Sequence, residues 1–116
     1  MVSKLFASLV LLTSVIGSAS AIPVLPTPCP PVHIIGCRAS GETTGAGIIG
    51  DLIDQVQRQS SQRVSSSAVD YPATLTNYAE SSSEGTANLK TVLTNQVNQC
   101  PDQKIVLVGY SQVWLF

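Results

Sequence analysis

Short apolar runs alternate along this chain with longer segments in which apolar residues recur at helical spacing. The last run, Ile-Val-Leu-Val, is continuously apolar, as expected for a strand of a parallel sheet that is covered on both faces. An earlier apolar run lies at residues 32–36. A serine-rich run at residues 64–71, which Pro72 closes, is a weaker strand signal. The pattern predicts three strands, at residues 32–36, 64–71 and 105–108.

Two helices are predicted between these runs. Residues 47–59 place an apolar stripe on one face, which includes Ile48, Leu52 and Val56. Residues 81–99 carry a second stripe and open on a serine and a glutamate at capping-box spacing, Ser81 and Glu84. The alternating order of strands and helices predicts an α/β fold with a parallel sheet and right-handed crossovers.

The N-terminal region has the pattern of a secretory signal. Lys4 supplies a positive start, an apolar stretch of about a dozen residues follows, and Ala19-Ser-Ala21 forms a small-residue cleavage site. The apolar stretch is shorter than the ~20 residues of a membrane span. Five prolines in the next ten residues favour an extended lead-in. We therefore expect a signal peptide at 1–21, a proline-rich lead-in at 22–31 and a single domain at 32–116 of a secreted, extracellular protein.

Composition excludes several classes of partner. The 116 residues carry a formal net charge of −1, and only 11% of them are charged, with no basic cluster. A protein that binds nucleic acid or an anionic membrane usually shows such a cluster. We expect neither partner. The acidic residues Asp51, Asp54 and Asp70 fit solvated helix or loop positions.

The three cysteines predict one disulfide and one remaining thiol. Cys29 and Cys37 flank the first strand, so they would lie roughly 20 Å apart, whereas a disulfide needs Cα atoms within about 7 Å. Cys29 and Cys100 both precede strands, and the starts of parallel strands share one edge of the sheet. We expect the Cys29–Cys100 pair, with Cys37 as a small buried residue rather than a reactive thiol.

The candidate chemistry lies directly after the last strand, at Gly109-Tyr-Ser-Gln112. A sharp turn from strand to helix would project the Ser111 hydroxyl clear of the sheet and aim the N–H of Gln112 into the same space. Such a serine becomes a nucleophile when a base takes its proton and donors wait for the oxyanion. The motif Gly-x-Ser is common on its own, so an ordinary turn serine is the alternative.

Three segments together resemble the cutinases and fungal acetylxylan esterases, a family of secreted serine esterases. They are Cys29-Pro-Pro-Val-His-Ile-Ile-Gly36 with Arg38, then Val69-Asp-Tyr-Pro-Ala73, then residues 100–112. The resemblance implies a partial α/β-hydrolase fold, a three-layer sandwich with about three parallel strands and two helices. It also implies a carboxylic ester hydrolase that needs no cofactor and no metal and acts on cutin-like polyester or acetylated xylan.

The resemblance also implies roles for single residues. Ser111 would be the nucleophile, and Gln112 would contribute a backbone oxyanion donor. Ser40 matches the family's Ser or Thr that supplies the second oxyanion donor. The pair Cys29 and Cys100 matches a family disulfide.

The chain departs from the family pattern after Gln112. Val113 stands where the family has glycine, and the family's catalytic aspartate and histidine come well after the serine. His33 lies inside the first strand and is expected to be buried there, while Asp102 precedes the third strand at the edge opposite Ser111. We therefore expect a truncated, catalytically incomplete form. Because every valine codon begins with GT, as most introns do, translation into a retained intron would explain Val113. A genuine short product is the alternative.

An alternative function follows from the same pattern. Three strands make about half of the family sheet, and the third strand would then form an exposed apolar edge, which invites aggregation. The chain would be a monomer or an aggregation-prone species. The alternative is a non-catalytic secreted fragment that binds a surface or a partner through that edge.

Overall fold

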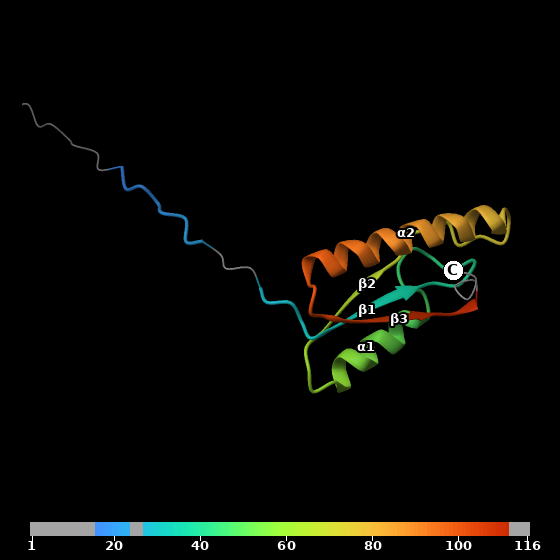
Figure 1. The fold of residues 1–116 in the computed structure, drawn as a ribbon, viewed down its shortest axis with the longest axis horizontal. Coiled ribbons are helices and arrows are strands. Elements are labelled where there is room, and N and C mark those ends of the chain that lie inside the picture. Colours follow the sequence, from blue (N-terminus) through green and yellow to red (C-terminus); the bar gives the residue numbers. More distant parts are fainter. Residues whose placement is uncertain (1–15, 24–26, 112–116) are drawn as a thin grey trace, which may run out of the picture.

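The computed structural model describes residues 16–23 and 27–111, which form one parallel sheet with a helix on each face (Figure 1). The sheet has the order β2-β1-β3, so that β1 is central. The predicted α/β three-layer arrangement is confirmed. The elements in chain order are β1 (Val32–Cys37), α1 (Ile49–Gln59), β2 (Val64–Ala68), α2 (Tyr78–Gln99) and β3 (Lys104–Gly109).

The register of the sheet fixes which residues share an edge. Val32 at the start of β1 pairs with Val64 on one side and Lys104 on the other. All three strands are parallel, so their carboxyl ends meet at the opposite edge. Cys37 and Gly109 are paired there, at the ends of β1 and β3.

The main hydrophobic core lies between the sheet and α2. Alternate residues of β1 point to this face, and the segment after β2 runs under the same helix. The predicted apolar stripe of α2 contributes Leu89, Val92 and Leu93, which confirms its orientation. The buried residues at the centre of this core are Ile35, Cys37, Val69, Tyr71 and Ala73.

The layer formed by α1 is thinner. Ile53 is the buried residue of this helix, and it packs so closely on Gly36 that a Cβ there would lie 2.8 Å from its Cδ1. The rest of the predicted stripe is largely exposed, with exposed fractions of 64% for Ile48, 52% for Leu52 and 40% for Val56. The predicted apolar stripe is present on α1, but Ile53 is its one buried residue among the described residues.

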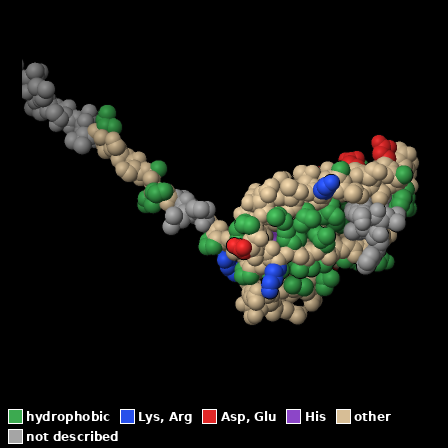
Figure 2. All heavy atoms as spheres, in the orientation of Figure 1, with side chains coloured by type: hydrophobic (Ala, Val, Ile, Leu, Met, Phe, Trp, Pro, Cys, Tyr) green, Lys and Arg blue, Asp and Glu red, His purple; other side chains and the backbone are tan. Residues whose placement is uncertain are grey.

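The third strand is an edge strand in the described chain. Val106 and Leu107 are 42% and 52% exposed, so the expectation of a strand covered on both faces was wrong. The expectation of an exposed apolar edge is confirmed. Figure 2 shows hydrophobic side chains gathered on the face along which β3 runs.

Helix α2 and strand β2 differ most from their predicted bounds. Helix α2 begins at Tyr78, three residues before Ser81, and its N-cap residue makes no side-chain capping bond. The Ser81 hydroxyl instead accepts the backbone N–H of Thr74 at 3.2 Å, so the predicted capping box was wrong. Strand β2 ends at Ala68, because beyond it the carbonyl oxygens of Val69 and Tyr71 accept hydrogen bonds from the Arg38 guanidinium.

The predicted disulfide is confirmed. Cys29 and Cys100 are bonded, with their Cα atoms 5.9 Å apart. Nearby, the backbone N–H of Lys104 donates to the carbonyl oxygen of Pro31 at 3.0 Å, so the lead-in is tied to the start of β3. Cys37 is a buried free thiol, and burial raises its pKa to about 11. It is therefore neutral and inert at ordinary pH, as expected.

The N-terminal predictions are only partly covered by the described residues. Residues 16–23 form exposed chain without regular structure that runs away from the sheet (Figure 1). The signal peptide at 1–21 stays a prediction, because most of it lies outside the described residues. Neither described helix is long and apolar enough to cross a membrane.

Candidate active site

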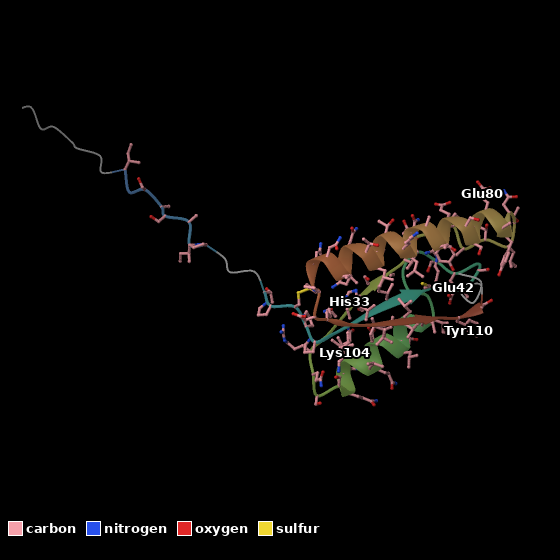
Figure 3. All side chains as sticks on the ribbon, in the orientation of Figure 1. His33, Glu42, Glu80, Lys104 and Tyr110 are labelled. Carbon is pink, nitrogen blue, oxygen red and sulfur yellow. A yellow bond between two sulfur atoms is a disulfide. The ribbon has the colours of Figure 1, made fainter. Side chains whose placement is uncertain are left out.

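The carboxyl edge of the sheet brings the two candidate serines to the same region. Because Cys37 and Gly109 are register partners, the segments that follow β1 and β3 leave the sheet side by side. Ser40 comes three residues after the first partner, and Ser111 comes two residues after the second. Figure 3 shows Glu42 and Tyr110 at this end of the sheet and Lys104 at the other.

Ser111 has an unusual backbone conformation. Its φ angle is +66°, in the left-handed region that side-chain-bearing residues rarely adopt. This conformation costs roughly 1–2 kcal/mol for a residue other than glycine. Strained turns of this kind cluster at functional sites, and a nucleophile between a strand and a helix is one such case. Ser111 is exposed, while Gln112 lies outside the described residues.

Ser40 lies in the loop between β1 and α1 and is half-buried. The residues on both sides of it are held by hydrogen bonds. The N–H of Ala39 donates to the Glu42 carboxylate at 2.6 Å, and the N–H of Gly41 donates to the carbonyl oxygen of Ala73 at 2.7 Å. The backbone that carries Ser40 is therefore fixed from two directions.

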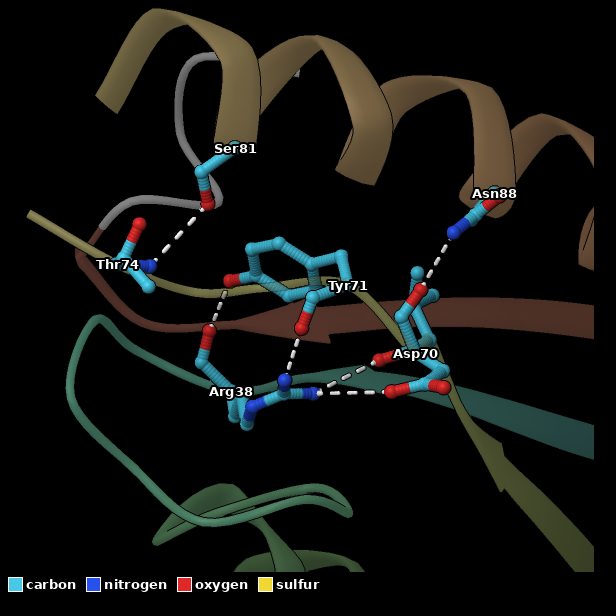
Figure 4. A network of polar contacts seen from close by, with 7 residues as sticks. Arg38, Asp70, Tyr71, Thr74, Ser81 and Asn88 are labelled. Carbon is cyan, nitrogen blue, oxygen red and sulfur yellow. Dashed lines mark hydrogen bonds and ion pairs between the residues drawn. The ribbon is translucent and has the colours of Figure 1, made fainter. Parts of the chain in front are cut away.

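A buried arginine joins this loop to the segment after β2 (Figure 4). Arg38 is only 4% exposed, and its guanidinium donates to the carbonyl oxygens of Val69, at 3.4 Å, and Tyr71. The Tyr71 hydroxyl returns a hydrogen bond to the carbonyl oxygen of Arg38. The guanidinium also lies over the Tyr71 ring, 4.9 Å from its centroid. These contacts lock the end of β1 against residues 69–71.

The ion pair of this cluster contributes little to its stability. The Asp70 carboxylate is 3.9 Å from the Arg38 guanidinium but is 86% exposed, so the pair adds little stability. The Arg38 Nε has no hydrogen-bond partner among the described residues. Burial raises the pKa of Tyr71, which keeps its hydroxyl protonated as a donor. The cluster is a structural clamp, and sequence reasoning did not find it.

His33 is placed as predicted, buried in β1 and 5% exposed. Its Nδ1 lies 2.7 Å from the Ser65 hydroxyl and its Nε2 lies 2.9 Å from the Ser67 hydroxyl, both on β2. Burial lowers the pKa of His33, which favours the neutral ring. This residue has the structural role that the sequence predicted.

His33 is too far from Ser111 to act on it. Its register partner is Ile105, six residues before Ser111. At about 3.3 Å per strand residue, six residues span about 20 Å. His33 is the only histidine of the chain, so no histidine of these 116 residues serves Ser111 in this fold.

The aspartates were also interpreted correctly as solvated residues. Asp51 and Asp54 are exposed on α1, and Asp70 is exposed as described above. Asp102 is exposed just before β3, at the edge opposite Ser111. Asp102 is therefore at the wrong edge of the sheet to orient a catalytic base beside Ser111.

Comparison with known proteins gives consistent matches over this region. A sequence profile of the family Cutinase matches residues 28–113. An acetylxylan esterase of Hypocrea jecorina is 34% identical over 91 residues, which cover 72% of this chain and 30% of the relative. The catalytic core domain of acetyl xylan esterase from Trichoderma reesei has 33% identity and a TM-score of 0.68 over 72% of this chain and 44% of that chain.

A second solved structure also matches this chain. It is a Trichoderma reesei cutinase in complex with a phosphonate inhibitor, with 25% identity and a TM-score of 0.65 over 76% of this chain and 42% of that chain. In all three matches this chain spans less than half of the other protein's length.

Proposed function

Because the chain belongs to the cutinase family, we propose that it carries the nucleophile half of a secreted serine carboxylic ester hydrolase. The observation that carries this proposal is the φ of +66° at Ser111, directly after β3. Such strain persists only where the surrounding structure holds it, and it clusters at functional sites. The turn presents the hydroxyl at the exposed carboxyl edge of the sheet, where a substrate can reach it.

Ser111 acts as the nucleophile in this proposal. Its Oγ attacks the ester carbonyl carbon while a base takes the hydroxyl proton, the base returns this proton to the leaving group, which departs as an alcohol, and water later releases the acid from the acyl-enzyme. Negative charge on the former carbonyl oxygen is stabilised by donors from Ser40 and from the backbone N–H of Gln112. The pairing of β1 with β3 supports this grouping, because it puts the loop with Ser40 beside the turn with Ser111.

The proton of Ser111 needs a base that these residues do not supply. His33 is engaged with Ser65 and Ser67 about 20 Å away by strand spacing. We infer that the base and its aspartate come from sequence outside these 116 residues, so that this chain alone is catalytically incomplete. The short coverage of each relative supports this inference.

The substrate class follows from the relatives. The matched proteins are named as acetylxylan esterases, cutinases and a carboxylesterase, so the proposed substrates are carboxylic esters. Acetylated xylan and cutin-like polyester are both proposed. Secretion is proposed from the signal pattern at 1–21 and from the disulfide, which persists in oxidising compartments.

An esterase assay tests this proposal in two steps. The chain alone should hydrolyse p-nitrophenyl acetate no faster than its Ser111→Ala variant, because it lacks a base. Residues 1–112 joined to the part of the Hypocrea jecorina acetylxylan esterase that follows the residue aligned with Gln112 should hydrolyse it, and Ser111→Ala in this chimera should remove the activity. A folded chimera whose activity survives Ser111→Ala would contradict the proposal, and a Ser111-dependent rate from the chain alone would contradict its incompleteness.

A further inference from the structure

The loop between β1 and α1 closes around a single carboxylate. Glu42 Oε2 accepts the N–H of Ala39 at 2.6 Å, and Glu42 Oε1 accepts the N–H of Ile48 at 2.8 Å. The two donors are nine residues apart in the chain. Hydrogen bonds from amides to a carboxylate are among the stronger ones in proteins. One side chain therefore ties the beginning of the loop to its end.

The backbone around the carboxylate is shaped to admit it. Gly47 has a φ of +61°, and a Cβ at this position would lie 2.1 Å from Glu42 Oε2 and 2.5 Å from its Cδ. No side chain larger than hydrogen fits there while the carboxylate keeps its place. The space for Glu42 is thus an independent feature of the loop, separate from the two hydrogen bonds.

The carboxylate also completes the start of α1. The N-cap residue is Ile48, whose side chain cannot accept a hydrogen bond, and the helix has no side-chain cap of its own. Glu42 accepts the N–H of Ile48 in place of a cap, and its negative charge lies at the positive end of the helix dipole. The loop is therefore anchored to a rigid helix rather than left to its own contacts.

The same carboxylate controls the backbone at Ser40. Ala39, whose N–H it binds, directly precedes Ser40, while Gly41 is held by the carbonyl oxygen of Ala73. We propose that Glu42 is a positioning residue for the oxyanion donor at Ser40. This rests on the function proposed above, in which Ser40 is that donor. Glu42 does not touch substrate, and it acts by fixing the direction of the peptide that carries Ser40.

A simpler role would be that of a helix cap alone. Two variants separate the roles, because Glu42→Gln keeps the length of the side chain without its charge and Glu42→Asp keeps the charge without the length. If Glu42 acts only as a cap through the helix dipole, the Glu42→Asp variant keeps its function. If Glu42 must hold two N–H donors at once, neither variant keeps its function. Asp51→Asn, which removes an exposed charge from the first turn of α1, is the matched control.

The experiment is amide NMR on the full chain labelled with ¹⁵N. In both Glu42 variants we expect the amide shift of Ser40 to move and hydrogen exchange at Gly41 to become roughly tenfold faster or more, the effect of losing a hydrogen bond to a charged group. Asp51→Asn should leave both signals unchanged. Gly41 is informative because its own partner, the Ala73 carbonyl oxygen, is untouched by these substitutions.

Two results would overturn the proposal: a change confined to Ile48, or an equal loss of protection throughout β1 and α1. If the variants do not fold, couplings across the hydrogen bonds from Ala39 N and Ile48 N to Glu42 Cδ are measured in the wild-type chain. Both couplings support the proposal, and their absence overturns it. A shifted amide signal of Ser40 supports the positioning role even where Ser111 proves unreactive, so the two proposals can fail separately.

Discussion

Removing the disulfide should cost this small domain a large share of its stability. The Cys29–Cys100 bond closes a loop with a sequence separation of 71 residues. In the chain-entropy model a loop of this length is worth about 4 kcal/mol at 25 °C. Domains are typically stable by only about 5–15 kcal/mol. The double variant Cys29→Ala/Cys100→Ala should therefore lose much of the free energy of unfolding.

Urea unfolding followed by circular dichroism measures this loss. With an m-value of about 1–1.5 kcal/mol per M for a domain of this size, the midpoint should fall by roughly 3 M. Local protection should fall too, because the N–H of Lys104 donates to the carbonyl oxygen of Pro31 close to the bond. Hydrogen exchange at Lys104 should therefore speed up in the variant.

A reducing agent provides the matched control. Dithiothreitol should bring the wild-type midpoint down to that of the double variant and should leave the double variant unchanged. A loss smaller than about 1 kcal/mol, or a wild-type midpoint that the reductant does not move, would refute the reasoning from loop closure.

Two further predictions concern the loop and the free thiol. Gly47→Ala should destabilise the chain by at least about 1 kcal/mol more than Gly41→Ala. Both alanines bear the cost of a left-handed backbone, but only the alanine at position 47 displaces the Glu42 carboxylate. Equal losses of the free energy of unfolding in urea would contradict this. Folded stability should fall as pH rises from 9.0 to about 11, because burial raises the pKa of Cys37 and the thiolate forms more readily in the unfolded chain. Cys37→Ala should show a smaller fall over this range in the same urea titration.

Much of the fold could be predicted because it depends on local pattern. The apolar run at the end of the chain and the alternating order of elements were sufficient for the parallel sheet. The disulfide followed from one geometric fact, that Cys29 and Cys100 both precede strands. The buried position of His33 followed from its place inside the first strand. Each of these inferences needs only the spacing of residues along the chain.

The errors arose where hydrogen bonds to residues outside the element outweigh local preference. Ser81 and Glu84 have capping spacing, yet the Ser81 hydroxyl bonds to Thr74 and the helix begins earlier. Strand β2 ends at Ala68 because Arg38, thirty-one residues before Val69, takes the carbonyl oxygen of Val69 for its guanidinium. Sequence spacing contains no information about such a partner.

The candidate site was predictable only in part. Ser111 was indicated by its place after an apolar strand, and its left-handed φ adds support that no sequence pattern contains. The roles of Arg38 and Glu42 were missed, because a side chain that binds backbone N–H or carbonyl groups leaves no periodic pattern. Their signal in the sequence was an apolar strand followed at once by Arg38 and, five residues after the end of the strand, by Glu42.

The most direct test of the central claim is covalent labelling of Ser111. A p-nitrophenyl alkylphosphonate loses nitrophenolate when an activated serine attacks its phosphorus, and the adduct stays on the protein. In the chimera that completes the domain, peptide mass mapping should find the phosphonyl group on Ser111, and the chain alone should remain unlabelled. A folded chimera that is labelled at another residue, or not at all, would contradict the assignment of Ser111 as the nucleophile.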